Sequence, residues 1–140
     1  MRREVAGQKI ARAEGRLTEA AALFAIDADA FAQDVGRRDL AAFYLMLAIQ
    51  ECIDLASHWI AAAGWPTAND SGGCFDVIAD KGGIGREVAG AMRGCVGIRN
   101  RIAHGYAGVD HARLHGEAPM GIAAARAFLA AAAATLQPGP

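Results

Sequence analysis

The sequence predicts an all-α protein, and two observations carry that prediction. Of the 140 residues, 34 are alanine, while aromatic residues make up 6% and only four prolines occur. Alanine favours helices because it loses no side-chain rotamer freedom when it joins one. Runs of β-branched and aromatic residues, which are typical of strands, are nearly absent. We therefore predict an antiparallel bundle of four to five helices, in one domain that spans residues 1–140.

The N-terminal half predicts two long helices joined by a short turn. The first extends from about residue 4 to residue 25, and apolar residues at seven-residue intervals mark its inward face: Ile10, Leu17 and Phe24. Asp27 or Asp29 is suited to cap a short turn around Phe31. The second helix, from about 39 to 63, is apolar around most of its circumference. We expect it to be buried in the bundle or against a second copy of the chain, which predicts a homodimer.

The next segment predicts a short helix followed by a longer one. Ser71 or Gly72 starts the short helix, which carries Phe75 and Ile78. The longer helix starts near Ile84, and we expect its inward residues to be Val88, Ala91 or Met92, Cys95 and Ile102.

Glycine, proline and aspartate punctuate the rest of the chain. We expect Gly105 to end the preceding helix in the left-handed conformation, which glycine adopts without strain. Asp110 is suited to cap the last helix, and Gly116 with Pro119 is expected to bend it.

Charge and cysteine usage limit the classes of function. The formal net charge of −1 does not recruit nucleic acid or an anionic membrane by bulk electrostatics. Residues 81–106 nevertheless hold five cations and a single carboxylate. The first residues lack the apolar core of a signal peptide, and the central apolar run is too short to span a bilayer. We expect a cytoplasmic protein without a cofactor, and reduced core thiols at three widely spaced cysteines: Cys52, Cys74 and Cys95.

A dense polar motif stands where the fourth helix should end, in the stretch GIRNRIAHGYAGVD of residues 97–110. Asn100 and His104 are four residues apart and share one helix face. Arg99 and His104 are five apart, or about 140° around the axis, so one regular helix cannot aim both at a single atom. Three arrangements would bring them together: the helix loosens before Gly105, the arginine side chain wraps, or two copies meet across a symmetric interface.

These residue types suit phosphodiester cleavage in RNA. The ribose 2′-OH is a nucleophile already present in the substrate, so no metal-bound water is needed and DNA is excluded. His104 would transfer protons at neutral pH, and Arg99 would stabilise the charge that develops on the phosphorane. Asn100 would position the histidine or a phosphate oxygen. A polar helix end whose cations complement the helix dipole accounts for the same residues without any catalysis.

The motif also carries a family resemblance. RNRIAHGY matches the R-N-x-x-x-H signature of HEPN-domain ribonucleases, and its continuation through His-x-Tyr to VD resembles the HepT-like toxins of HepT/MntA toxin–antitoxin systems. The likeness continues through LAIQECIDLASHWIAAAGWP, FDVIADKGGIG and MRGCVGIRNRIAHGY, which keep the family's order from about residue 39 to residue 110.

The resemblance implies a helical bundle that homodimerises, with two motifs facing a shared cleft. It also implies metal-independent cleavage of RNA, and a cognate MntA-like nucleotidyltransferase antitoxin that adenylylates (AMPylates) the motif tyrosine. Carried over by position, Arg99 and His104 are catalytic and Asn100 supports them. Tyr106 is then the modification site, and the other arginines of the basic segment are candidate RNA contacts: Arg86, Arg93 and Arg101.

Two further functions fit the same residues. The bundle could be a non-catalytic subunit that binds a nucleotide or a nucleotidyltransferase, with the motif only gripping phosphate, or it could be an inert structural bundle. Turnover separates the three, because only a ribonuclease cleaves RNA in EDTA. His111 and His115 form an H-x3-H pair, but only Asp110 and Glu117 stand near enough in sequence to complete a ligand set, so we expect no metal site.

Overall fold

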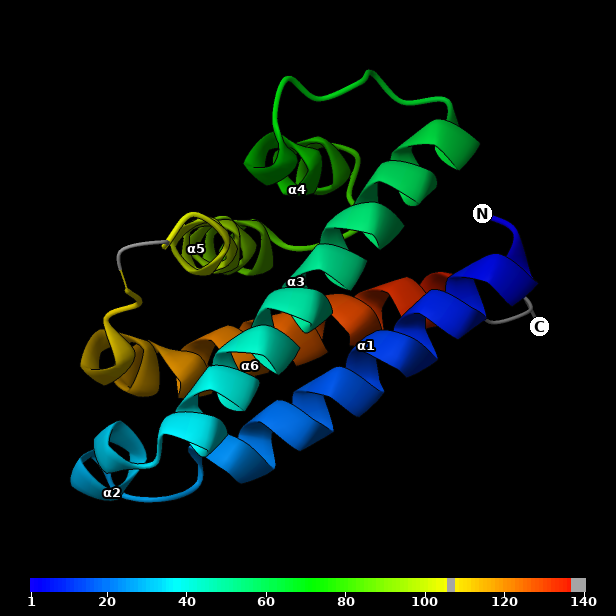
Figure 1. The fold of residues 1–140 in the computed structure, drawn as a ribbon. Coiled ribbons are helices and arrows are strands. Elements are labelled where there is room, and N and C mark those ends of the chain that lie inside the picture. Colours follow the sequence, from blue (N-terminus) through cyan, green and yellow to red (C-terminus); the bar gives the residue numbers. More distant parts are fainter. Residues whose placement is uncertain (106–107, 137–140) are drawn as a thin grey trace.

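The computed structural model describes residues 1–105 and 108–136, and over these residues it contains six helices and no strand. Three long helices form the body of the molecule: α1 (Arg3–Phe24), α3 (Val35–Ala63) and α6 (His111–Thr135). Helix α1 runs antiparallel to α3 and α6 and packs against both (Figure 1). The prediction of an all-α antiparallel bundle is confirmed.

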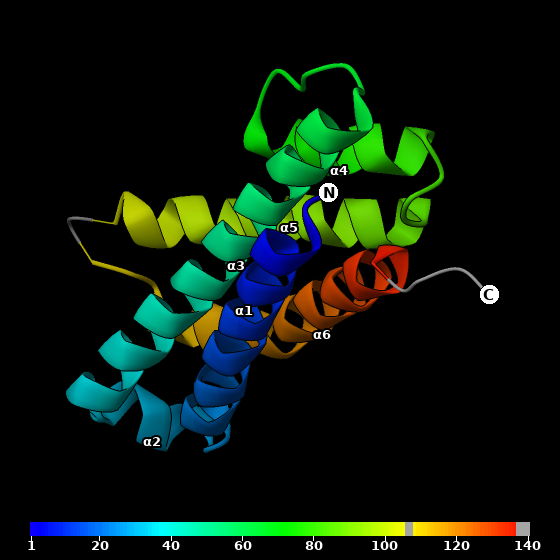
Figure 2. The ribbon, with the colours of Figure 1, turned by 90° about the vertical axis from the view of Figure 1, so that its right-hand side faces the viewer.

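The remaining helices are shorter. Helices α4 (Ser71–Asp80) and α5 (Arg86–Ala103) form a hairpin that lies across the long helices (Figure 2). Helix α2 (Ala28–Gln33) joins α1 to α3 at the end of the bundle that lies away from the N-terminus (Figure 1). It raises the number of helices above the predicted four to five, because the expected turn around Phe31 closes into a six-residue helix that buries this side chain.

Aspartate caps four of the six helices. The carboxylates of Asp27, Asp34, Asp70 and Asp110 each accept a hydrogen bond from the backbone N–H three residues later. Each such cap stabilises a helix by about 1 kcal/mol. The caps predicted at Asp27 and Asp110 are confirmed. Helix α3 starts at Val35, earlier than the predicted residue 39, because Asp34 caps its first turn. Helix α6 runs through Pro119 as one element, and the predicted bend there stays a prediction.

One apolar core joins all six helices. The side chains predicted for the inward face of α1 are all buried, and no polar or charged side chain is buried among the described residues. Phe75 of α4 meets Phe128 of α6 edge-on with 5.0 Å between the ring centroids, and Trp59 of α3 lies 6.3 Å from the same ring. These aromatic contacts fix the α4–α5 hairpin on the long helices.

Helix α3 is only partly covered by this core. By length and composition alone, α3 and α6 could each cross a membrane, but 50% of the apolar window of α3 and 44% of that of α6 are buried inside the bundle. Burial of this kind is typical of core helices in soluble proteins. The first half of α3 leaves an exposed apolar patch, which we call the α3 patch: Val35, Leu40 and Phe43, with exposed fractions of 55%, 42% and 49%.

Candidate functional site

Helix α5 determines where the motif side chains lie. It packs one face into the core through Ala89, Met92, Cys95, Val96 and Ile98. Of the predicted inward residues, Met92 and Cys95 are buried, while Val88 and Ile102 are half-buried. The helix stays regular as far as Ala103, and His104 is its C-cap residue. The helix therefore does not loosen ahead of the histidine.

The Arg99 side chain extends from α5 toward the start of α4. Its Nη2 donates a hydrogen bond to Ser71 Oγ at 3.3 Å, and its Nε is buried without a hydrogen-bond partner among the described residues. A surface cavity of about 380 Å³ lies here, lined by Ser71, Arg99, Asn100 and their neighbours. The arginine consequently does not wrap around α5 toward His104.

His104 faces a different cavity. This cavity, of about 460 Å³, lies between the end of α5 and the start of α6, and Val109 and Arg113 line it together with the histidine. Asn100 lines both cavities, whereas Arg99 and His104 each line only one. Within one chain, the two predicted catalytic side chains thus line different cavities, which share Asn100. The pairing of two copies, the third of the expected arrangements, stays a prediction.

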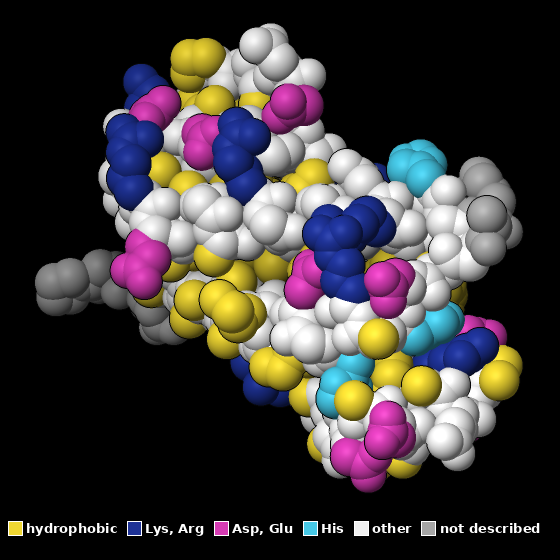
Figure 3. Space-filling model, turned by 90° about the vertical axis from the view of Figure 1, so that its left-hand side faces the viewer, with side chains coloured by type: hydrophobic (Ala, Val, Ile, Leu, Met, Phe, Trp, Pro, Cys, Tyr) yellow, Lys and Arg dark blue, Asp and Glu magenta, His cyan; other side chains and the backbone are white. Residues whose placement is uncertain are grey.

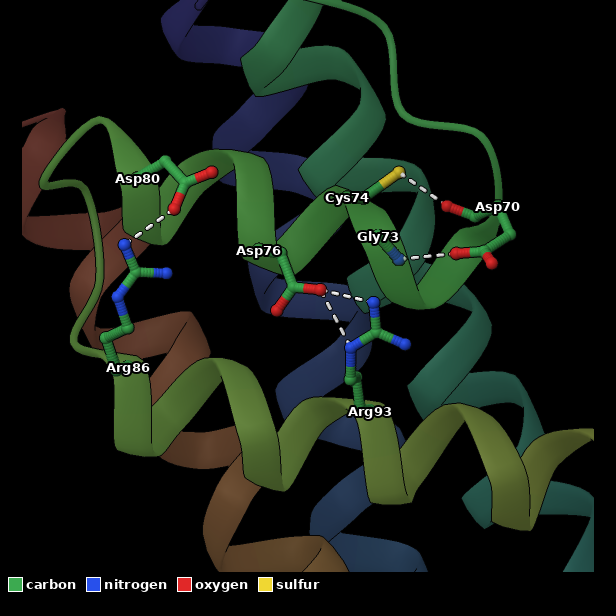
Figure 4. A network of polar contacts seen from close by, with 7 residues as sticks. All are labelled: Asp70, Gly73, Cys74, Asp76, Asp80, Arg86 and Arg93. Atoms are coloured by element: carbon green, nitrogen blue, oxygen red, sulfur yellow. Dashed lines mark hydrogen bonds and ion pairs between the residues drawn. The ribbon is translucent and has the colours of Figure 1, made fainter.

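The three candidate RNA contacts are all engaged in ion pairs. In each pair, an arginine nitrogen approaches a carboxylate oxygen. Arg86 Nη2 lies 2.6 Å from Asp80 Oδ1, Arg93 binds Asp76 and Arg101 binds Glu117. Figure 4 shows the first two pairs along the seam between α4 and α5. On the face shown in Figure 3, basic and acidic side chains accordingly lie side by side. The positive excess of residues 81–106 is thus offset by carboxylates from α4 and α6, and these arginines can contact RNA only by competing with them.

The conformation predicted for Gly105, just after α5, is wrong. Gly105 does not take a left-handed φ angle, which along the described residues occurs only at Gly64, Gly82 and Gly108. Gly105 is required for another reason, since a Cβ there would lie 2.8 Å from the carbonyl oxygen of Arg101. The tyrosine assigned as the modification site, Tyr106, lies outside the described residues.

The two histidines of α6 contact different partners. His115 Nε2 lies 2.7 Å from the carbonyl oxygen of Ile26, and its ring packs on Phe31 with 5.0 Å between centroids. His111 Nε2 lies 3.6 Å from Asp39 Oδ1. Burial, together with the positive charge of Arg38, lowers the pKa of His111. Within the described residues, no group of three histidine, cysteine or acidic side chains is arranged to hold a metal ion.

Sequence reasoning missed Ser71 as part of the site. This residue was expected only to start a helix, and nothing in its immediate sequence connects it to an arginine 28 residues later. The contact exists because the α4–α5 hairpin brings the start of one helix against the end of the other.

Several solved structures have this arrangement of helices, among them HEPN toxins. A tri-AMPylated Shewanella oneidensis HEPN toxin in complex with MNT antitoxin aligns with a TM-score of 0.84 at 20% identity, over 93% of this chain and 97% of that one. A mutant of the toxin–antitoxin pair MntA–HpeT aligns with a TM-score of 0.83 at 20% identity, over 94% and 98% of the two chains. YutE of Bacillus subtilis, a cytosolic protein of unknown function, gives 0.76 at 16% identity, over 92% and 89%. These likenesses establish the fold as that of HEPN toxins.

The sequence itself assigns the family. The family model described as Ribonuclease HepT-like matches residues 13–131, which include the whole R-N-x-x-x-H motif. The chain therefore belongs to the HepT-like ribonuclease family, as the resemblance predicted. No curated protein matches the chain.

Proposed function

We propose that this protein is the metal-independent endoribonuclease toxin of a type VII, HepT/MntA-like toxin–antitoxin system and acts in the cytoplasm. Membership of the HepT-like ribonuclease family supports the reaction class. The observation that carries the proposal is the state of the Arg99 side chain. It is half-buried beside a cavity and has no carboxylate partner among the described residues. A guanidinium in this state keeps its full charge available for a phosphate.

The proposed chemistry uses the 2′-OH of the RNA as nucleophile. His104 takes the proton from this hydroxyl, or returns a proton to the 5′-oxygen as the P–O bond breaks, since an imidazole can do either near neutral pH. Arg99 donates hydrogen bonds to the oxygens that gain charge in the transition state. Asn100, which lines both cavities, holds a phosphate oxygen or the histidine between them.

The complete site requires two copies of the chain. Because α5 is regular and Arg99 extends toward α4, the arginine of one copy and the histidine of another form each catalytic pair in this proposal. A two-fold axis would generate two such pairs per dimer.

The α3 patch is our candidate for the dimer interface. It adjoins a groove of about 600 Å³ between α3 and the end of α5, lined by Phe43, Met46, Ile102 and Val109 among others. Ala103 and Gly105 also line this groove, so a copy seated on it lies next to the residues on either side of His104. An apolar surface that continues into the motif is what a shared cleft requires.

Regulation would take place through Tyr106. An MntA-like nucleotidyltransferase would transfer one or more AMP groups from ATP to the tyrosine hydroxyl, with release of pyrophosphate. A related structure supports this step, because the Shewanella oneidensis toxin is tri-AMPylated and in complex with MNT antitoxin. The added phosphate, two residues beyond His104 in sequence, would occupy the place of the substrate phosphate and be held by the same positive group.

Cleavage of RNA in EDTA tests the proposed activity. Purified chain should cut single-stranded RNA and leave DNA of the same sequence intact. His104→Ala and Arg99→Ala should each lose about 10²–10⁴-fold in rate, as expected when a proton-transfer or charge-stabilising group is removed. Arg126→Ala, an exposed arginine on α6, is the matched control. Retention of RNA binding without cleavage by the unmodified parent would favour the non-catalytic binding subunit instead.

Mass spectrometry tests the regulation. Co-expression with the neighbouring nucleotidyltransferase should add mass in units of AMP and abolish cleavage. Tyr106→Phe should stay unmodified and active, while Tyr44→Phe, at the only other tyrosine, should behave like the parent. A mass increase that survives Tyr106→Phe would contradict the assignment.

A further inference from the structure

Arg99 is held differently from the other arginines of α5. Arg86, Arg93 and Arg101 each bind a carboxylate, whereas Arg99 binds a neutral hydroxyl, that of Ser71. A carboxylate partner would compete with a phosphate for the guanidinium and cancel its charge. A hydroxyl restrains the side chain and leaves the charge intact. The contact therefore gives Arg99 a fixed orientation at no electrostatic cost.

Ser71 does not depend on Arg99 for its own position. It is the first residue of α4, where Asp70 Oδ1 accepts a hydrogen bond from Gly73 N at 2.7 Å and fixes the first turn. Two ion pairs then fasten α4 to α5, one between Asp76 and Arg93 and one between Asp80 and Arg86 (Figure 4). The hydroxyl is thus anchored by contacts that do not involve Arg99.

The Ser71 contact leaves most of the guanidinium free. Of its five N–H donors, only one on Nη2 is used by Ser71, and the Nε–H has no partner among the described residues. Both residues line the same cavity of about 380 Å³. The hydroxyl of Ser71 accepts from Arg99, so its own hydrogen is available to a second acceptor in that cavity.

We propose that Ser71 is the positioning residue for Arg99, holding the guanidinium at the angle from which it meets the scissile phosphate. This inference rests on the proposed ribonuclease activity and adds to it a residue that the R-N-x-x-x-H motif does not contain. Removal of the hydroxyl lets the guanidinium turn without disturbing its charge. The substitution should therefore slow the chemical step and leave substrate binding nearly unchanged, because Arg99 stabilises charge that develops only in the transition state.

Steady-state cleavage of RNA by variants at Ser71 tests the proposal. Ser71→Ala should lower kcat about three- to tenfold, the effect of losing one long hydrogen bond, with KM nearly unchanged. Ser71→Thr, which restores the hydroxyl, should recover the parent's kcat. Ser57→Ala is the matched control, because the Ser57 hydroxyl also faces α4, 3.7 Å from Cys74 Sγ, but has no contact with Arg99. Thermal midpoints of all variants identify any that fold poorly, and Ser71→Thr keeps the test decisive if Ser71→Ala is one of them.

An NMR measurement separates this inference from the proposed function. The Nε–H signal of Arg99, assigned by its disappearance in Arg99→Lys, should show a lower order parameter in Ser71→Ala than in the parent or in Ser57→Ala. If the parent cuts RNA and Ser71→Ala has the parent's kcat and Arg99 order parameter, Ser71 has no positioning role while the ribonuclease assignment stands. If the parent cuts no RNA, the assignment is wrong and the role of Ser71 in cleavage falls with it.

Discussion

Replacing Phe43 with aspartate should convert the proposed homodimer into monomers. Phe43 is a 49% exposed member of the α3 patch and lines the groove that reaches the end of α5. A phenylalanine side chain buries about 200 Å² when fully covered, so about 100 Å² remains to be buried by a partner. At about 25 cal/mol per Å², this area corresponds to roughly 2.5 kcal/mol per subunit.

Two-fold symmetry doubles that contribution. Each dimer contains two copies of Phe43, so the substitution removes roughly 5 kcal/mol from association, or more than about 10³-fold in Kd. An aspartate at the same place adds the penalty of burying an unpaired carboxylate. The other half of the Phe43 side chain is covered within the monomer, so the substitution also removes roughly 2.5 kcal/mol of burial there, and the variant must be shown to fold.

Sedimentation velocity over a range of protein concentrations measures the effect, with a thermal melt to confirm folding. Met120→Asp is the control, since Met120 on α6 is 80% exposed but does not line the α3 groove. The parent and Met120→Asp should be dimers at micromolar concentration, and Phe43→Asp should be monomeric and inactive on RNA. A folded Phe43→Asp variant that dimerises with the parent's Kd would refute the interface, and a monomeric parent would refute the two-copy site itself.

Three further predictions concern the core and the titratable groups. Phe128→Ala, which empties a fully buried site beside Phe75, should cost about 3–5 kcal/mol in urea unfolding, and a loss below about 1 kcal/mol would contradict the packing described. The pKa of His111 is lowered by burial and by Arg38, so the folded state resists protonation. The contribution of His111 to the free energy of unfolding is present above its unfolded pKa of about 6.5 and is lost as the pH falls through its lower pKa in the folded state. Urea midpoints should therefore drop toward pH 5, and less so in His111→Gln; identical slopes would exclude this histidine as the cause. Burial raises the pKa of the Cys95 thiol to about 11, so a thiol reagent at neutral pH should label Cys95 in urea but hardly in the native chain, and rapid native labelling would show that the site opens.

Local signals in the sequence predicted the helices well. The spacing of Ile10, Leu17 and Phe24 identified the buried face of α1, and Asp27 and Asp110 identified two helix starts, because periodicity and capping act within a few residues. The left-handed conformation expected for Gly105 was wrong because it depends on more than the neighbouring residues. A glycine after a helix indicates that a side chain is excluded, but whether the cause is a left-handed φ or a close backbone approach depends on the path of the following loop.

The candidate site was predictable only in its residue types. The 140° separation of Arg99 and His104 followed from helix geometry, and their positions at separate cavities agree with it. The partners of the arginines were not predictable, because Ser71 reaches Arg99 only through the packing of α4 on α5. The ion pairs of Arg86 and Arg93 likewise depend on that packing, and the pair of Arg101 with Glu117 depends on the packing of α6 on α5.

Mixed dimers of Arg99→Ala and His104→Ala test the shared site most directly. Each variant alone should be inactive, because every site in its dimer lacks one of the two groups. In a mixed dimer, the intact arginine of one subunit meets the intact histidine of the other, which restores one of the two sites. Equal amounts, unfolded together and refolded so that subunits pair at random, should recover about one quarter of the parent's cleavage rate in EDTA. Recovery near that level is the result we expect, and a mixture that forms heterodimers yet cuts no RNA would contradict a site built from Arg99 and His104 of two subunits.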